Sequence, residues 1–289
     1  MKIVHYAGSW PTNIGNAFID YGAKAMYEAA FPGCEVVFIS SFKDYLGKQV
    51  FHKGIFEFKD YLDIDIFSIG GCCLGYTAIE SHYESIIKKL RIKNPNMKVI
   101  VPGAGMWDYG TDMQTSYKII DKIKPDIFIS RDTNSFTAGR NIANAYDGID
   151  CGFFMDPNMK EIINFKHDYV AAADCPKQNI PKDEKLPGAY AYHTMNHPYN
   201  YEDNNFISDM PFEYLSLYKN AKRVYSHRVH ACVAAIAFNV PTQLMNNLGM
   251  RESLFDKVGV ENIHNMSLVN RDAFEKVKSD QITFLRDNL

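Results

Sequence analysis

The sequence predicts an α/β protein of two Rossmann-like domains that face each other across a cleft, the second domain being the smaller. Apolar strands alternate with amphipathic helices through the first half of the chain, which is the pattern of βαβ units on a buried parallel sheet. A shorter run of the same alternation follows a stretch rich in proline and lysine. The 289 residues are enough for two domains with a core each.

Each segment of the first half has the length and pattern of one element. Short apolar runs bounded by glycine or polar residues predict strands, and longer segments with apolar residues at i, i+3 and i+4 predict helices. The segment at 53–62 fits neither pattern clearly. We predict strands at 2–7, 34–40, 63–71, 97–105 and 126–132, and helices at 13–31, 77–93, 111–124 and 133–144.

A looser stretch at 157–188, rich in proline, lysine and aspartate, predicts the linker between the domains. We therefore assign residues 1–160 to the first Rossmann-like domain and residues 185–289 to the second. The second α/β unit consists of shorter segments and ends with a helix. These segments lie at 189–193, 205–210, 213–221, 222–227, 231–239, 241–245 and 272–288.

The stretch "SHRVHACVAAIAFNVP" contains a change from strand to helix. The preceding "KRVY" is β-prone, "ACVAAIAFN" is helix-prone, and Pro241 ends the helix before a further strand, "TQLM". This order places Arg228 and His230 at the start of a helix, just after Ser226. Unpaired backbone N–H groups and the helix dipole favour an anion there. Arginine adds a forked cation and histidine a titratable group, so we predict a functional site rather than a solvated charge pair.

Further candidates follow from the geometry of parallel sheets, in which ligands bind beyond the carboxyl ends of the strands. Two of these candidates also have a purely structural explanation. Thr12 or Asn16 could cap the first helix, and Arg131 and Asp132 could form a surface ion pair. The glycine-ended strands do not match G-x-G-x-x-G, which argues against a dinucleotide. The strand ends of the first domain carry Asn13, Gly15, Asn16, Gly71, Gly105, Arg131 and Asp132.

Composition and charge argue against several classes of partner. A formal net charge of −3 and the lack of long Lys/Arg blocks argue against nucleic acid and against an anionic membrane surface. The first ten residues are too interrupted for a signal peptide, and no stretch reaches the roughly 18 apolar residues of a membrane-spanning helix. We therefore expect a cytoplasmic protein without an integral membrane segment.

Cysteine and histidine spacing argues against a metal site. The six cysteines show no paired spacing and include adjacent Cys72 and Cys73, so we expect reduced thiols and no structural zinc. His193 and His197 are four residues apart, but no acidic partner accompanies them and Pro198 follows. We expect neither a metal nor a cofactor.

Taken together, these motifs resemble the polysaccharide pyruvyl transferase family. "SHRVHACVAAIAFNVP" is similar to the R-x-H-A…A…P signature of that family, in which a serine or threonine often precedes the arginine. "TNIGNAFI" resembles its Asn-x-Gly-Asp motif, "ISRDTNS" its Arg-Asp-x-x-Ser motif, and "MDP" at 155–157 its Asp-Pro, and the order agrees over most of the chain. The resemblance implies a GT-B-like pair of Rossmann domains that moves the enolpyruvyl group of phosphoenolpyruvate onto a sugar as a ketal.

The resemblance also implies roles for single residues. Arg228 and His230 would hold phosphoenolpyruvate on the second domain, with Arg131 helping from the first domain, which would be the acceptor side. The family's aspartate falls on Asn16, which cannot act as a carboxylate base. No clear lysine follows "PTQLM", where relatives often have one.

The chemistry of ketal formation requires an anion cradle, a general acid and a general base. His230 could be the acid or only a phosphate ligand, and Asp132 and Asp108 are candidate bases. We predict a transferase that acts on a polysaccharide or on its lipid-linked or nucleotide-linked precursor. A lipid-linked acceptor would bring the protein into peripheral contact with a membrane. Two alternatives stay open: a GT-B-type glycosyltransferase that holds a nucleotide sugar, and a catalytically silent relative that binds a glycan, which Asn16 would explain.

Overall fold

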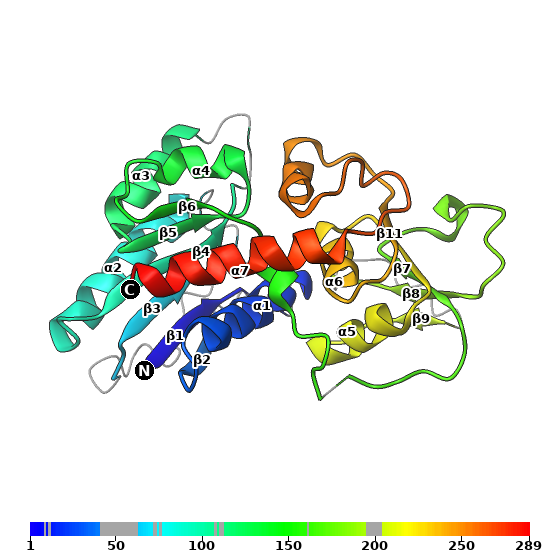
Figure 1. Cartoon of the computed structure of the whole chain (residues 1–289), viewed down its shortest axis with the longest axis horizontal. Coiled ribbons are helices and arrows are strands. Elements are labelled where there is room, and N and C mark those ends of the chain that lie inside the picture. Colours follow the sequence, from blue (N-terminus) through cyan, green and yellow to red (C-terminus); the bar gives the residue numbers. More distant parts are fainter. Residues whose placement is uncertain are drawn as a thin grey trace.

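The structure, a computed structural model, consists of two α/β domains side by side (Figure 1). The predicted fold class is confirmed, and the segment at 53–62 lies outside the described residues. The described residues are 1–8, 10, 13–40, 63–71, 74, 77–106, 109, 113–160, 162–194 and 204–289.

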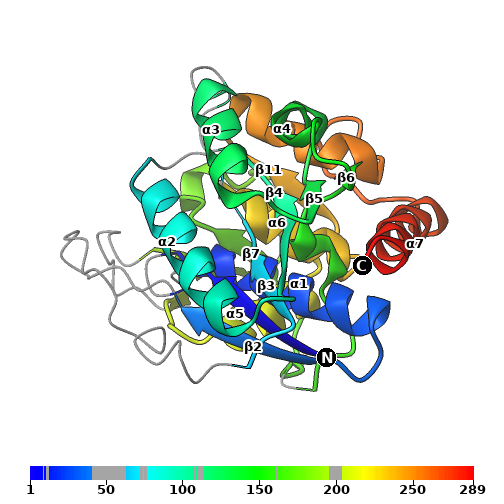
Figure 2. The same cartoon turned by 90° about the vertical axis from the view of Figure 1, so that its left-hand side faces the viewer.

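The first domain is built on a parallel six-stranded sheet in the order β2-β1-β3-β4-β5-β6. Its strands are β1 (Lys2–Ala7), β2 (Glu35–Ser40), β3 (Ile66–Ile69), β4 (Lys98–Ala104), β5 (Ile127–Ser130) and β6 (Ala145–Asp147). Its helices are α1 (Gly15–Ala30), α2 (Thr77–Lys93), α3 (Met113–Ile123) and α4 (Thr133–Gly139). In Figure 2, α2 and α3 lie on one side of this sheet, and α1 and α7 (Arg271–Asp287) lie on the other.

Alternation along β5 explains why both faces of the first sheet are covered. Ile127 and Ile129 point into the core shared with α1, whereas Phe128 points into the core shared with α2 and α3. All three side chains are fully buried. A strand that is apolar on both faces is stable only between two layers of helices, as in other parallel sheets.

The second domain has a parallel five-stranded sheet in the order β11-β10-β7-β8-β9. Its strands are β7 (Val170–Ala173), β8 (Gly188–Ala191), β9 (Asn205–Phe206), β10 (Arg223–Ser226) and β11 (Thr242–Leu244). Its helices are α5 (Pro211–Asn220) and α6 (Val229–Ala237), with the 3-10 helices η3 (Lys177–Asn179) and η4 (Gly249–Val258). The 3-10 helix η2 (Cys151–Phe154) lies in the chain that connects the two sheets.

The structure differs from the sequence-based domain boundaries at both ends of the second domain. β7 is the central strand of the second sheet, yet it lies inside the stretch predicted to be a linker. Its sequence, VAAA, is rich in alanine, which has weak strand propensity and obscures the pattern. At the other end, α7 crosses back to the first domain, where Tyr146 and Phe284 stack with ring centroids 4.8 Å apart and Arg286 Nε donates to Ala30 O at 3.2 Å.

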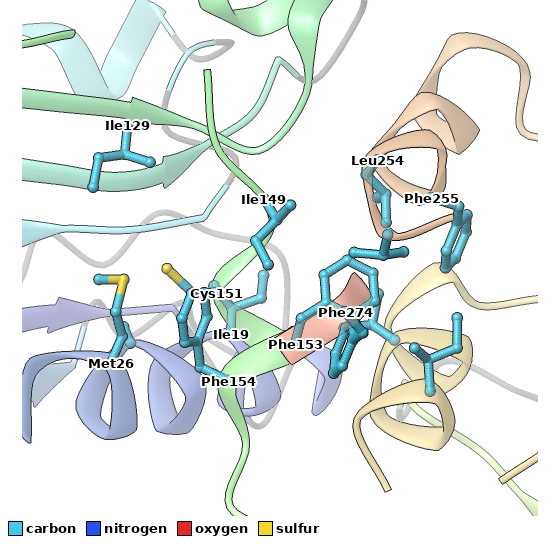
Figure 3. Close-up of a cluster of buried hydrophobic side chains, with 14 of the residues drawn as sticks. Ile19, Met26, Ile129, Ile149, Cys151, Phe153, Phe154, Leu254, Phe255 and Phe274 are labelled. Atoms are coloured by element: carbon cyan, nitrogen blue, oxygen red, sulfur yellow. The ribbon is translucent and has the colours of Figure 1, made fainter. Parts of the chain in front are cut away.

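One hydrophobic core continues across the junction of the domains. It combines buried side chains of α1, η2, α6, η4 and α7. Figure 3 shows Phe153 of η2 beside Phe255 and Phe274, and the ring centroids of Phe153 lie 6.2 Å and 5.8 Å from theirs, both in edge-to-face geometry. This shared core fixes how the carboxyl ends of the two sheets meet.

Strand order reverses at one point in each sheet, between β1 and β3 in the first and between β7 and β10 in the second. In doubly wound sheets such a reversal opens a crevice at the carboxyl ends of the strands, where ligands bind. The loops after β1, β7 and β10 therefore lie where a ligand is expected to bind.

None of the helices in the described part of the chain combines the length and the apolar character that a membrane crossing requires. Four described cysteines, Cys34, Cys151, Cys175 and Cys232, are free thiols, and the remaining two lie outside the described residues.

Candidate active site

The turn between β10 and α6 is shaped by Ser226. Its hydroxyl accepts a hydrogen bond from the Arg228 N–H at 2.7 Å and donates to the Arg228 carbonyl at 2.8 Å. Arg228 is the N-cap residue of α6, as the strand-turn-helix pattern predicts. Because the Ser226 hydroxyl is fully buried and bonded to the backbone, its place in the structure is that of a turn-forming residue. The substrate contact predicted for it stays a prediction.

Arg228 is paired with an aspartate that the sequence reading did not single out. Its Nε donates to Asp174 Oδ2, and its Nη2 lies 3.5 Å from Thr194 Oγ1. The Arg228 side chain is 35% exposed, so part of it is accessible to a ligand. Asp174 directly follows β7 and has a φ of 47°, a left-handed conformation that is uncommon outside glycine. Its Oδ1 also accepts the His193 N–H at 3.0 Å.

His230 lies in the first turn of α6 and is 7% exposed. Its Nε2 is 3.6 Å from Oδ2 of Asp150, and neither atom has a hydrogen-bond partner among the described residues. Asp150 caps η2 by accepting the Gly152 N–H at 2.8 Å. Burial raises the pKa of Asp150, but His230 and Arg131 outweigh it and hold that pKa below its ordinary value. A carboxylate therefore faces the imidazole and can orient and stabilise it as it gains or releases a proton.

Arg131 meets the same carboxylate from the first domain. Its Nη1 is 3.9 Å from Asp150 Oδ2, and its Nη2 donates to the Tyr109 hydroxyl at 3.0 Å and the Met106 carbonyl at 3.3 Å. The side chain is only 1% exposed. A Cβ atom on Gly105 would lie 2.1 Å from Arg131 Nε, so only glycine leaves room for the guanidinium. In this structure Arg131 contacts Asp150 and is itself buried from solvent.

Asp132 is bonded within the first domain. It is the N-cap residue of α4 and accepts from Ser135 N–H at 2.7 Å and from Ser135 Oγ at 3.1 Å. The Tyr109 hydroxyl donates to its Oδ2 at 2.7 Å. Burial is the main cause that raises the pKa of Tyr109 to about 12, so the phenol keeps its proton. The predicted role of Asp132 as a base stays a prediction, and the structure adds Asp150 as a carboxylate closer to His230.

The start of α1 lies against the start of α6. Asn13 Oδ1 accepts the Gly15 N–H at 3.2 Å, and the Ile14 N–H donates across the domain junction to the His193 carbonyl at 3.0 Å. A Cβ atom on Gly15 would lie 3.2 Å from His230 Cβ and 3.5 Å from His193 Nδ1. Glycine therefore allows the N-terminal ends of two helices, one from each domain, to approach the same point. The dipoles of both helices favour negative charge there, although the first N–H groups of α1 are already bonded within the protein.

Asn16, Gly71 and Gly105 make contacts within the first domain. The Asn16 side chain packs against Gly8, where a Cβ atom would lie 2.7 Å from Asn16 Cβ. Gly71 and Gly105 are joined by a backbone hydrogen bond of 3.1 Å. Asp108 lies outside the described residues.

One motif residue does not join the site. Asp156 of the "MDP" segment is exposed and accepts the Asn158 N–H at 2.8 Å, as in a surface turn. His197 lies outside the described residues, and the described residues contain no group of three His, Cys, Asp or Glu side chains arranged to hold a metal ion.

Asp150, Asp174 and His193 are the site residues that sequence reasoning missed or set aside. An acidic residue inside the apolar run "GIDCGFF" is the signal that could have found Asp150, because a buried charge needs a partner. Asp174 ends an apolar strand, the same rule that found the first-domain candidates. The strand itself had been assigned to the linker.

The two-sheet arrangement belongs to the GT-B-like class of paired Rossmann domains. Similar solved structures include a putative UDP-N-acetylglucosamine 2-epimerase from Listeria monocytogenes, at 8% identity and a TM-score of 0.53, covering 100% of this chain and 90% of that chain. Another is the UDP-GlcNAc 2-epimerase from Methanocaldococcus jannaschii, at 12% identity, a TM-score of 0.51, and coverage of 96% and 92%. At these identities the likeness concerns the fold alone.

Sequence comparison gives the family. The model of the polysaccharide pyruvyl transferase family matches residues 13–247, and the chain belongs to this family. The match includes both the segment that begins at Asn13 and the turn with Arg228 and His230. No curated protein matches the chain. The protein is thus a member of a transferase family of polysaccharide biosynthesis, with two helix N-termini, an accessible arginine and a carboxylate-facing histidine at one place.

Proposed function

We propose that the protein transfers the pyruvyl group of phosphoenolpyruvate to two hydroxyls of one sugar in a polysaccharide or glycan precursor, forming a pyruvate ketal. The observation that carries this proposal is the meeting of the α1 and α6 N-termini at Gly15 and His230, with Arg228 beside them. Phosphoenolpyruvate has a carboxylate and a phosphate, and two helix dipoles together with a forked guanidinium suit this multiply charged anion.

Each residue of the site has a different role in the proposed reaction. Arg228 binds the donor with the guanidinium nitrogens that Asp174 does not use. The imidazole of His230 moves a proton, and Asp150 stabilises the imidazolium while it is charged. Arg131 keeps Asp150 ionised from the protein side. The second domain then supplies the donor side and the first domain the acceptor side, as the resemblance implies.

The atoms of the reaction balance with one proton relay. One sugar hydroxyl adds to C2 of the enolpyruvyl group and loses its proton, while C3 gains a proton and becomes a methyl group. The second hydroxyl then replaces the phosphate at C2 and its proton leaves with the phosphate. His230 is the group placed to accept and return the proton in these steps, so no redox partner is needed.

The donor can be tested by isothermal titration calorimetry with phosphoenolpyruvate and, separately, with UDP-N-acetylglucosamine. We expect binding of phosphoenolpyruvate and phosphate release in the presence of a galactose- or mannose-type acceptor. Binding of the nucleotide sugar alone would instead support the glycosyltransferase alternative. Donor binding without release of phosphate from phosphoenolpyruvate in the presence of any acceptor would support the silent, glycan-binding alternative.

Substitution of two neighbouring histidines, one at a time, distinguishes a loss of catalysis from a loss of folding. His230→Ala should lower the rate of phosphate release by about a hundredfold or more, the usual scale for a general acid or base, with a smaller loss of donor affinity. His227→Ala is the matched control, because the His227 Nε2 bonds to Asn179 at 3.1 Å instead of facing Asp150. A His230→Ala enzyme with wild-type turnover at saturating donor would contradict the proton-transfer role.

A further inference from the structure

His193 is a buried imidazole to which the proposed reaction gives no task. It follows β8 and is 3% exposed. Its Nε2 lies 2.5 Å from the Tyr218 hydroxyl oxygen, whereas its Nδ1 has no hydrogen-bond partner among the described residues. Buried polar atoms of this kind are rare, and a catalytic role or a bound ion or water is a recognised reason for them.

The environment of His193 fixes where its proton lies. Burial is the main cause that lowers the pKa of His193 to about 3, so the ring is neutral and carries a single N–H. Burial raises the pKa of Tyr218 well above its ordinary value, so the phenol keeps its proton. If the phenol donates to Nε2, the ring proton sits on Nδ1 and one donor is left without a partner. The other tautomer would leave both the phenol proton and the Nδ1 lone pair without partners, which is less favourable.

The backbone of His193 holds the ring at the junction of the two helix ends. Its N–H donates to Asp174 Oδ1 at 3.0 Å, and its carbonyl accepts the Ile14 N–H at 3.0 Å. The Nδ1 atom lies 3.5 Å from the point where a Cβ on Gly15 would stand, and His230 Cβ lies 3.2 Å from the same point. The unpartnered nitrogen therefore lies beside the start of both helices.

We propose that the Nδ1–H of His193 donates a hydrogen bond to an anionic oxygen of the donor substrate. The identity of that substrate, phosphoenolpyruvate, rests on the proposed function. A neutral donor suits this position because Arg228 and His230 already supply charge, while a fixed N–H adds direction to the binding of a carboxylate or phosphate oxygen. Tyr218 acts as a positioning residue, because it selects the tautomer.

Two substitutions test the proposed hydrogen bond, because each replaces a different one of the two ring nitrogens. The amide nitrogen of His193→Asn can replace Nδ1–H, whereas the longer side chain of His193→Gln reaches Tyr218 and leaves the Nδ1 position empty. Calorimetry should show the affinity for phosphoenolpyruvate reduced about ten- to a hundredfold in His193→Gln, the effect of one hydrogen bond to a charged group. His193→Asn should keep more of the affinity than His193→Gln. Equal affinity in the wild type and both variants, with thermal unfolding confirming that all three fold, would overturn the proposal.

A measurement on the wild type needs no substitution at position 193. Nitrogen NMR of protein labelled in its histidines should show the Nδ1–H tautomer of His193 in the free protein and a shift of that nitrogen when phosphoenolpyruvate or inorganic phosphate binds. Tyr218→Phe removes the hydroxyl that selects the tautomer, so His193 should populate both tautomers. This substitution should weaken donor binding by less than His193→Gln does. A free protein with the proton on Nε2 would overturn the inference while leaving the proposed function intact. If the wild type binds no phosphoenolpyruvate but its His193 nitrogen shifts with inorganic phosphate, only the proposed function is overturned. If the nitrogen shifts with neither anion, the inference is overturned.

Discussion

Gly22, in the middle of α1, is the place where one added methyl group should push α1 away from η2. A Cβ atom there would lie 1.9 Å from the Cys151 carbonyl oxygen and 2.9 Å from the Cα of Gly152. Both neighbours are backbone atoms of η2, which cannot rotate away. To restore even a 3.0 Å contact, α1 and η2 must move apart by about 1.1 Å in Gly22→Ala.

Two effects of Gly22→Ala oppose each other, and their sizes decide the outcome. Alanine within a helix is more favourable than glycine by roughly 0.5–1 kcal/mol. Overpacking of a dense interior typically costs about 1–3 kcal/mol and more where the backbone has to shift. We therefore expect a net loss of about 1–2 kcal/mol in the free energy of unfolding. At roughly 2–4 °C for each kcal/mol in a large domain, the melting temperature should fall by several degrees.

Urea denaturation and thermal unfolding measure this loss, with Lys24→Ala as a control on the same helix. Lys24 is partly exposed and, within the part of the chain that the structure describes, pairs with Glu28, so its substitution should change stability by less than about 0.5 kcal/mol. Because Asp150 directly precedes η2 and lies 3.6 Å from His230, phosphate release should also slow in folded Gly22→Ala protein. A Gly22→Ala protein as stable as the wild type would refute the close-contact argument.

Three further predictions concern the site. Asp150→Asn should slow phosphate release by about a hundredfold, the scale of a lost acid–base partner. Burial raises the pKa of Asp150 but His230 and Arg131 bring it below the ordinary value, so its stabilising contribution is present above about pH 4 and is lost at lower pH. Chemical denaturation should show the stability difference between wild type and Asp150→Asn narrowing as the pH falls below 4, and a constant difference would contradict this. Arg228→Lys keeps the charge but loses the fork, so calorimetry should show weaker binding of phosphoenolpyruvate by about tenfold or more, whereas equal affinity would mean that Arg228 does not fork on the donor. Asn16→Asp should leave the rate of phosphate release within about threefold, because the proposed mechanism assigns proton transfer to His230 and Asp150, and a large increase would return that role to position 16.

Local patterns were sufficient to predict much of the secondary structure and the turn at α6. The strand-to-helix change around Arg228 depends on residues that are neighbours in sequence, namely a β-prone run, an alanine-rich run and Pro241. β7 was not predicted, because an alanine-rich strand is stabilised by its neighbours β10 and β8 rather than by its own propensity. The short β6 is likewise defined by its pairing with β5.

The candidate site shows the same division between local and long-range information. His230 and Arg228 could be predicted because one turn contains both. The approach of Asp150 to His230 joins residues far apart in sequence, and it depends on the packing of Phe153 in the core that both domains share. No local pattern encodes that packing, although the isolated charge at Asp150 in an apolar run is a trace of it.

The return of α7 to the first domain gives the molecule two separate attachments between its halves, one through η2 and one before α7 (Figure 1). The core shared by α1, η2, α6, η4 and α7 fills the space between these two attachments, so sliding and rotation of one domain against the other are resisted. Asp150 lies beside the first attachment and His230 on the second domain, so the 3.6 Å between them depends on how the two domains are held together. A change that loosens either attachment should therefore also lengthen the distance between the carboxylate and the imidazole.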